Sequence, residues 1–129
     1  IEKNGLKETA NRLGKGIIAF SPLAQGLLTD RYLHGIPEDS RIRTDGRFLK
    51  ESTLTEEKLE QIRTLNAIAA ARGQTLAEMA LAWILKDGQI TSVLIGASRP
   101  EQILDDLKAL DNTAFTPDEL RAIDAASGF

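Results

Sequence analysis

Two continuous apolar runs, at residues 16–20 and 90–95, stand out among segments in which apolar residues recur every three or four positions. Runs that lack polar alternation are typical of parallel strands buried on both faces. The three- and four-residue spacing predicts helices at 2–13, 55–72 and 75–85, a further helix after residue 98 and a last one after residue 116. Strands separated by helices form parallel crossover units, so the pattern predicts an α/β fold.

The helices predicted after residue 54 each begin with a side chain suited to N-capping: Thr55, Thr75, Ser98 and Thr116. Glu78 and Glu101 follow Thr75 and Ser98 at the spacing of a capping box. The 75–85 helix is apolar on all sides, Trp83 included, which predicts that it is buried. The next helix is predicted to be lined by Leu104, Leu107 and Leu110.

The composition is that of an ordinary globular domain and narrows the possible functions. The chain has 129 residues, 42% apolar, and a net charge of −3, which excludes a disordered protein. Without cysteine, and with His34 alone, neither a disulfide framework nor a Cys/His zinc site can be built. The pI of about 5.2 argues against nucleic-acid binding, and no apolar run approaches the ~20 residues of a membrane span. We therefore expect a small-molecule ligand, with no nucleic-acid or membrane partner.

Loops that follow the two predicted strands are the first candidates for a binding site. Residues 96–100 lead from a strand into a helix, where backbone N–H groups and the Ser98 hydroxyl could hold an anion. The alternative is a plain turn in which Ser98 only caps the helix. Residues 21–26 follow the first strand, the place where α/β proteins put ligand loops, and the alternative there is a rigid turn.

Residues 34–52 form an unusually long predicted loop that is rich in arginine. Loops of this length are usually functional or disordered. The arginines could grip a phosphate, or they could form a solvated surface paired with Asp39 and Asp45. The only histidine, His34, lies in this loop, which is bounded by Gly and Pro residues. This position favours a surface histidine over a general base, and we assign it no role.

Three segments together carry a resemblance to a known family. They are AFSPLAQGLLTDRY at 19–32, GIP followed by Ser40 and Arg41, and SVLIGASRPEQ at 92–102. In this order and spacing the chain closely resembles the C-terminal part of aldo-keto reductases. Within that family it is similar to the branch of bacterial L-glyceraldehyde 3-phosphate reductases and potassium channel beta subunits. The match runs over essentially the whole chain.

The resemblance implies a cytoplasmic, NADPH-dependent oxidoreductase that reduces a small carbonyl substrate, an aldehyde or ketone, to an alcohol. Its fold would be the C-terminal part of a TIM (β/α)8 barrel, two parallel strands with flanking helices. Because such a barrel needs about 250 residues, we expect residues 1–129 to be a C-terminal fragment of a single barrel domain. The lack of an initiator Met at Ile1 agrees with that expectation. The family's catalytic Asp, Tyr, Lys and His belong to earlier strands, so no residue here corresponds to them, and we expect the chain alone to be inactive.

The residues that match cofactor-binding positions of the family fall in three places. The loop after the first predicted strand and the stretch that covers the cofactor supply Ser21, Pro22, Leu23, Ala24, Gly26, Arg31 and Arg41. The loop after the second strand, which holds the adenosine end and its 2′-phosphate, supplies Gly96, Ser98 and Gln102. Relatives commonly have Asn where this chain has Asp106, so an added negative charge lies near the adenine.

Two other functions stay open at this point. The chain could belong to a nucleotide-sensing regulatory module, as in channel beta subunits, or it could be an inactive truncated product. In either case the two apolar strands leave edges that a chain of this length does not cover, which invites association. We therefore expect self-association, including a homo-oligomer, or marginal stability.

Overall fold

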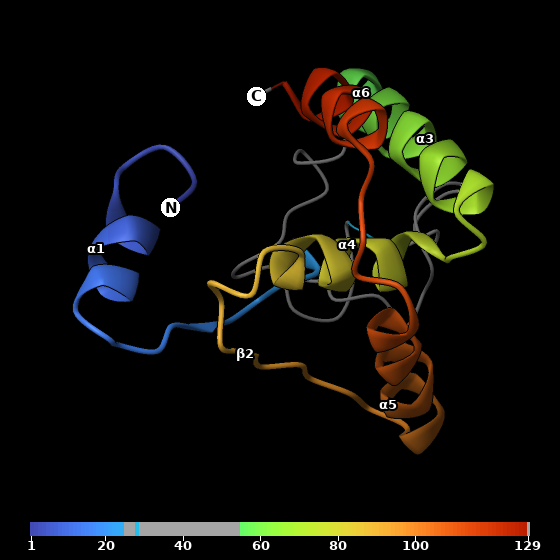
Figure 1. Cartoon of the computed structure of the whole chain (residues 1–129). Coiled ribbons are helices and arrows are strands. Elements are labelled where there is room, and N and C mark those ends of the chain that lie inside the picture. Colours follow the sequence, from blue (N-terminus) through green and yellow to red (C-terminus); the bar gives the residue numbers. More distant parts are fainter. Residues whose placement is uncertain (25–27, 29–54, 129) are drawn as a thin grey trace.

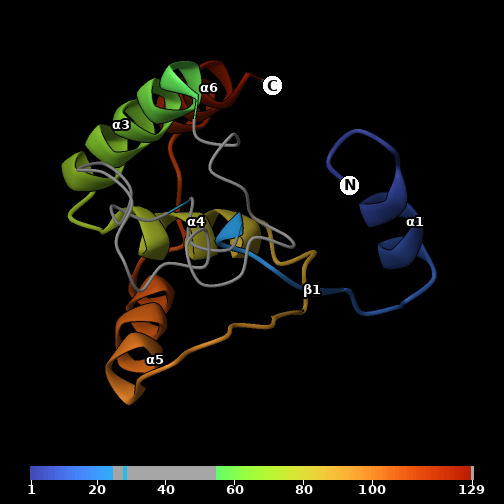
Figure 2. The same cartoon turned by 180° about the vertical axis from the view of Figure 1, so that it is seen from behind.

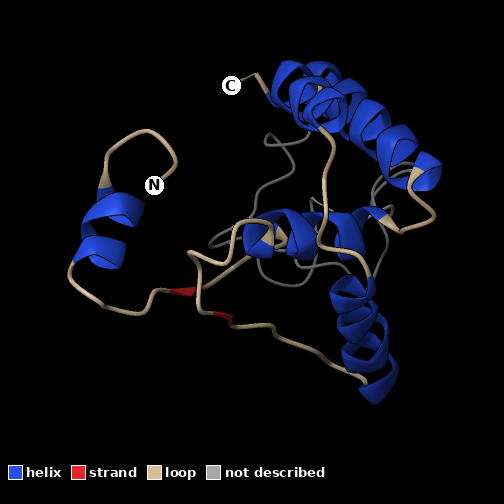
Figure 3. Ribbon diagram, in the orientation of Figure 1, coloured by secondary structure: helices blue, strands red, loops and turns tan. Residues whose placement is uncertain are grey.

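The computed structural model describes residues 1–24, 28 and 55–128, and its regular structure is mainly helical (Figures 1 and 3). In chain order the elements are α1 (Leu6–Arg12), β1 (Ile18–Ala19), α3 (Glu56–Ala71), α4 (Leu76–Leu85), β2 (Ser92–Val93), α5 (Pro100–Leu107), the 3₁₀ helix η4 (Lys108–Asp111) and α6 (Pro117–Ser127). Apart from Leu28, residues 25–54, which include the arginine-rich loop with His34, lie outside the described residues.

The two strands pair in parallel, which confirms the predicted crossover arrangement. Ile18 is paired with Ser92 and Ala19 with Val93, and the connection between the strands includes α3 and α4. Just before the strands, the Thr91 hydroxyl oxygen accepts a hydrogen bond from the Ile17 N–H at 3.0 Å. A Cβ on Gly16 would lie 3.0 Å from the same oxygen, so a larger side chain here would require the Thr91 side chain to shift by a few tenths of an ångström. Each strand is only two residues long, shorter than the predicted runs.

The prediction that both strands are buried on both faces is wrong for the described structure. Ile18 is 64% exposed and Phe20 is 79% exposed, and Leu94 is exposed as well. Within the described residues, each strand has one neighbour in a two-stranded sheet. The apolar runs were read correctly as parallel strands, but burial of both faces requires further strands and helices around them.

The predicted helix starts at Thr55, Thr75 and Thr116 are confirmed. Each threonine hydroxyl oxygen accepts a hydrogen bond from the backbone N–H three residues later, at 3.1, 3.2 and 3.1 Å respectively. At Thr75 and Thr116 the box is complete, because Glu78 and Glu119 accept from the backbone N–H of the capping threonine. These caps depend on residues close in sequence, which explains why the sequence alone was sufficient to place them.

Helix α4 joins two apolar clusters and confirms the prediction of a buried helix. The larger cluster lies where α3, α4 and α6 meet and contains Ile62, Leu65, Ala69, Leu76, Met79 and Ile123, with Trp83 half-buried against it. Helices α3 and α6 lie side by side above α4 (Figures 1 and 2). The smaller cluster contains Leu81, Ala82 and Ala109, and the side chain of Leu23 packs against it.

Helix α1 stands apart from the other helices and is attached to them by charged groups (Figure 2). The buried ammonium group of Lys7 contacts Glu2 at 2.8 Å and Asp87, in the turn after α4, at 2.5 Å. Burial alone would raise the pKa of Asp87, but the hydrogen bonds from Lys7 and the Gln89 N–H, together with the charges of Lys7 and Lys86, outweigh it and hold this pKa below its usual value. Both pairs are therefore ionised at neutral pH and tie α1 to the end of α4.

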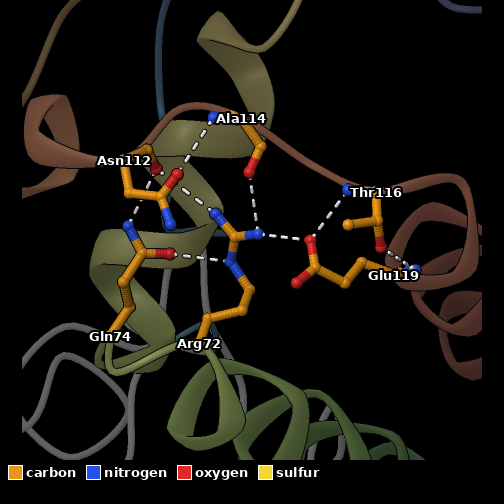
Figure 4. A network of polar contacts seen from close by, with 6 residues as sticks. All are labelled: Arg72, Gln74, Asn112, Ala114, Thr116 and Glu119. Carbon is orange, nitrogen blue, oxygen red and sulfur yellow. Dashed lines mark hydrogen bonds and ion pairs between the residues drawn. The ribbon is translucent and has the colours of Figure 1, made fainter.

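The side chain of Arg72 connects the end of α3 with the segment that leads into α6 (Figure 4). It donates to the Glu119 carboxylate at 2.5 Å, to the carbonyl oxygens of Ala114 and Asn112 at 2.9 and 3.3 Å, and to the Gln74 side chain at 2.9 Å. The guanidinium also lies 3.7 Å from the ring centroid of Phe115. The side chain of Arg72 is only 2% exposed, so these partners replace water almost completely.

Replacing this buried arginine should destabilise the α3–α6 pairing strongly. In Arg72→Ala, the two carbonyl oxygens and Glu119 lose a charged donor inside the protein, a loss that typically costs about 3 kcal/mol. We expect the midpoint of urea unfolding, followed by circular dichroism, to fall accordingly.

Arg63→Ala is the matched control, because Arg63 also pairs with two carboxylates, Glu56 and Glu60, but is 44% exposed on α3. Its removal should change the urea midpoint little, since exposed pairs contribute little to stability. Equal losses of stability in the two variants would contradict the role given to Arg72.

Candidate functional site

The described residues of the two predicted loops, 21–24 and 96–98, follow the carboxyl ends of the parallel strands. Because β1 and β2 run in the same direction, the loops that follow them leave from the same edge. The hydrogen bond from the Leu94 N–H to the Ala19 carbonyl oxygen, at 2.8 Å, joins the two segments there. Beyond it the segments diverge, one toward α4 and the other toward α5 (Figure 1). The structure therefore brings the start of both predicted loops together but separates their far ends.

The first loop, residues 21–24, is held in a strained backbone conformation. Ser21 has a φ of 52° and Ala24 a φ of 47°, a region that residues with a Cβ rarely occupy. The Ala24 N–H donates to the Ser21 carbonyl oxygen at 3.2 Å, and Leu23 anchors the loop on the α4–η4 cluster. Strain of this kind collects at functional sites more often than elsewhere. The other predicted residues of this region, Gly26, Arg31 and Arg41, lie outside the described residues.

The second loop directs three donors at a single oxygen atom. The amide oxygen of Gln102 accepts from the Ser98 N–H at 2.8 Å, from the Ser98 hydroxyl at 3.2 Å and from the Arg99 N–H at 3.3 Å. These groups are exposed at the start of α5, where the helix dipole also favours negative charge. A Cβ placed on Gly96 would meet no atom within 4 Å, so the backbone on the strand side of this loop is open.

The predicted capping box of Ser98 and Glu101 is wrong, because α5 begins one residue later than expected. Arg99 is the N-cap residue and Pro100 the first helical residue, which places Gln102, and not Glu101, at the third position. Proline is favoured at the first helical position, since it lacks an N–H and its φ is already helical. Pro100 was therefore the signal in the sequence that could have fixed this boundary and identified Gln102 as the capping side chain.

Asp106 is a predicted site residue with a carboxylate in an apolar setting. It borders an open groove of about 300 Å³ between α4, β2 and α5, lined by Leu81, Leu85, residues 91–93, Ile95, Leu107, Ala109 and Leu110. Burial raises the pKa of Asp106, and the negative charges of Asp105 and Glu78 raise it further. Glu78 comes from α4 and is itself buried, a proximity that sequence spacing could not indicate.

The neighbouring carboxylate, Asp105, has a different environment. It is exposed and accepts a hydrogen bond from the Lys108 ammonium group at 3.0 Å, so the two adjacent acids point to different sides of α5. Across residues 1–24 and 55–128, no three histidine or acidic side chains gather as metal ligands, and no helix is long and apolar enough to cross a membrane.

Neutralising Asp106 should stabilise the chain at neutral pH. A carboxyl group whose pKa is raised on folding favours the folded state below its ordinary pKa of 3.8, and this contribution is lost as the pH rises through the raised value. Asp106→Asn removes the buried charge, so we expect a higher urea midpoint than the unmodified chain at about pH 7 and a smaller difference at about pH 3.

Asp111→Asn serves as the control, since it removes the same charge from an exposed position in η4 and should not reproduce the effect. A lower urea midpoint for Asp106→Asn at neutral pH would show that the charged form of Asp106 is stabilising.

Two solved structures share this arrangement of elements. A glycerol dehydrogenase from Gluconobacter oxydans superposes with a TM-score of 0.74 and 26% identity, covering 98% of this chain and 38% of its own. A thermostable aldo-keto reductase superposes with a TM-score of 0.62 and 26% identity, covering 97% of this chain and 34% of its own. The two parallel strands with their helices are consistent with part of such a barrel.

Similar sequences come from bacteria and yeast. The L-glyceraldehyde 3-phosphate reductase of Escherichia coli K12 is 52% identical over 127 residues, which cover 96% of this chain and 37% of the relative. A putative voltage-gated potassium channel subunit beta of Schizosaccharomyces pombe is 39% identical over 120 residues, 90% of this chain and 35% of the relative. The chain thus spans little more than a third of the length of these relatives. The profile of the Aldo/keto reductase family matches residues 1–127, and the chain belongs to that family.

Proposed function

We propose that this chain supplies the cofactor-binding part of an NADPH-dependent oxidoreductase that reduces aldehydes or ketones to alcohols. The observation that carries the proposal is the convergence of the Ser98 N–H, the Ser98 hydroxyl and the Arg99 N–H on one oxygen atom at the start of α5. Three donors placed around an oxygen at a helix N-terminus are suited to a phosphate oxygen. Membership of a family that contains reductases also supports an oxidoreductase function.

The residues present fit a phosphorylated dinucleotide at this edge of the barrel. A phosphate oxygen would replace the Gln102 amide oxygen among the three donors, and the Gln102 side chain would turn aside to admit it. Gly96 leaves the approach to the backbone free of side-chain atoms. The family resemblance adds Arg31 and Arg41 as cationic contacts for the 2′-phosphate. When bound, the nicotinamide would supply the hydride, while this chain's residues would hold the adenosine end.

Asp106 acts against the phosphate in this proposal. Its carboxylate carries a negative charge that repels a phosphate within a Debye length of ~8 Å. Two arginines, a helix N-terminus and three hydrogen-bond donors oppose this single charge. We therefore propose that NADPH is preferred over NADH despite the acidic substitution.

A regulatory nucleotide sensor is the second candidate function, and the similarity to a putative potassium channel subunit beta favours it. Such a module would bind NADPH through the same loops without needing rapid turnover. The two functions differ in the residues that would donate a proton to the carbonyl oxygen, which the resemblance assigns to strands outside this chain. Measurement of both the turnover rate and the nucleotide affinity of the natural protein would distinguish the two functions. A sensor would bind NADPH tightly but turn over slowly.

The chain alone should show no reductase activity. The proposal gives it residues that hold the cofactor and none that protonate the substrate, so bound NADPH would have no acid beside the carbonyl group. Purified residues 1–129 should oxidise NADPH in the presence of glyceraldehyde or a glyoxal no faster than buffer. Saturable turnover would show that a proton donor lies within the chain.

The nucleotide preference can be measured in a chimera in which residues 1–129 replace the matching segment of the Escherichia coli K12 reductase. We expect tighter binding of NADPH than of NADH in fluorescence titrations. In Ser98→Ala, the loss of a hydrogen bond to a charged group should weaken NADPH binding roughly tenfold or more and NADH binding less.

Ser127→Ala is the matched control, because Ser127 donates its hydroxyl to a carbonyl oxygen within α6, far from this loop. It should leave both affinities unchanged. Equal affinities for NADPH and NADH in the unmodified chimera would reject the proposed 2′-phosphate site.

A further inference from the structure

Asn4 and Gly5, immediately before α1, are exposed and have an unusually open peptide group between them. Gly5 has a φ of 74°, in the left-handed region, and a Cβ placed on it would meet no atom within 4 Å. Among residues 1–24, 28 and 55–128, no group accepts a hydrogen bond from the Gly5 N–H. Within the described structure, the nitrogen of this peptide group is therefore neither shielded by a side chain nor held by an acceptor.

The side chain of Asn4 folds back over the same peptide group. Its amide oxygen, Oδ1, accepts a hydrogen bond from the Leu6 N–H at 3.1 Å. A contact between a side-chain oxygen and the N–H two residues later closes a short turn, which keeps the amide carbon of Asn4 near the Gly5 nitrogen. The Leu6 N–H also faces the oxygen on which negative charge would develop during attack at this carbon, and such a donor lowers the barrier.

We propose that Asn4 is a site of spontaneous deamidation, and that its isoaspartyl product loosens α1. The Gly5 nitrogen, after a base has removed its proton, attacks the amide carbon of Asn4, and the amide nitrogen leaves as ammonia with a proton from water. The product is a five-membered succinimide. Water then opens this ring: hydrolysis at the side-chain carbonyl gives aspartate, and hydrolysis at the main-chain carbonyl gives isoaspartate, in which Gly5 is joined through the side-chain carbon.

A second turn of the same kind shows why the neutral amide matters. Asp87 Oδ1 accepts a hydrogen bond from the Gln89 N–H at 3.0 Å, and Gly88 lies between them with a φ of 69°. The Asp87 carboxylate, however, is ionised and paired with Lys7 at 2.5 Å. A negatively charged carboxylate resists attack by a nucleophile and offers no leaving group comparable to ammonia. We therefore expect Asp87 to stay unmodified while Asn4 reacts.

Deamidation at this position acts on the charged groups that attach α1 to the end of α4 (Figure 2). The Glu2–Lys7 ion pair, 2.8 Å between Oε1 and Nζ, spans the Asn4–Gly5 bond, and Glu2 also lies 3.5 Å from the Lys86 ammonium group. Isoaspartate inserts an extra carbon atom into the main chain between Glu2 and Lys7. We expect the isoaspartyl form to lose the contacts of Glu2 and to hold α1 less firmly.

The test follows the chemistry of the folded chain over time. Residues 1–129 are incubated at mildly alkaline pH, and their peptides are mapped by liquid chromatography and mass spectrometry. We expect the Asn4 peptide to gain about one dalton and to separate into an isoaspartyl and an aspartyl form. The rate should rise with pH, because the attacking nitrogen must first lose its proton. Isoaspartate is confirmed by transfer of a labelled methyl group from an isoaspartyl methyltransferase.

Asn112 is the matched control within the same chain. Its Oδ1 accepts a hydrogen bond from the Ala114 N–H at 3.2 Å, as that of Asn4 does from Leu6, but the residue between is Thr113. A β-branched side chain crowds the attacking nitrogen and restricts the backbone. We expect Asn4 to deamidate roughly tenfold faster than Asn112 or more, since a small difference in activation free energy has that effect.

Two variants separate the reaction from its consequence for α1. Gly5→Ala should slow the reaction at Asn4, whereas Asn4→Gln should prevent it during the incubation, because attack would have to close a six-membered ring. Trp83, the only tryptophan, reports the state of the attachment, since the Lys86 ammonium group that Glu2 contacts lies 3.7 Å from its ring centroid. Incubation should shift the fluorescence of the unmodified chain and leave that of Asn4→Gln unchanged.

Three results would overturn the proposal. They are conversion at Asn4 no faster than at Asn112, isomerisation of Asp87 at a rate comparable to that of Asn4, and the same Trp83 fluorescence in the incubated chain and the incubated Asn4→Gln variant. None of these measurements involves a nucleotide, so they are independent of the proposed 2′-phosphate site.

Discussion

The parallel pairing of β1 with β2 is the constraint on which the rest of the structure depends. A parallel pair cannot be closed by a tight turn, so the chain must return to the same end of the sheet before it forms the second strand. Helices α3 and α4 lie on that return path, and α4 packs between the clusters that hold α6 and η4. The same pairing sends the loops after both strands from one edge, which is what places Ser21 and Gly96 at the same end of the fold.

The parts of the fold that sequence could predict are those determined by neighbours along the chain. The caps at Thr55, Thr75 and Thr116 depend on groups three residues away, and all were placed correctly. At α5 the sequence offers two competing start signals, Ser98 and Pro100, which lie two residues apart. The prediction followed Ser98, whereas the helix begins at Pro100. Residues close in sequence therefore determine the helix start in both cases, but at α5 two of them give conflicting indications.

Burial was predicted less well, because it depends on elements that are distant in sequence. The apolar runs around β1 and β2 and the leucines of α5 were expected to be inside, yet Phe20, Leu94 and Leu104 are exposed. Arg72 shows the opposite case, a charged residue that becomes buried because carbonyl groups of the η4–α6 segment and Glu119 surround it. In both cases the local sequence pattern shows whether a side chain is apolar or charged. Whether that side chain is buried depends on elements that are distant in sequence.

Helix α5 follows the proposed nucleotide contacts and also carries a row of exposed leucines. The donors at Ser98 and Arg99 lie just before its first residue, Pro100, and Leu104, Asp106 and Leu107 lie on the turns that follow. A helix of eight residues is too short to be stable in isolation, so its position depends on what packs against it. Covering the leucines would restrict the helix and with it the Ser98 and Arg99 N–H groups at its start. If such packing orders α5, a bound phosphate does not have to supply that ordering free energy again, and linkage requires the reverse to hold equally. A nucleotide bound as proposed would therefore be held better where further elements cover the leucines of α5.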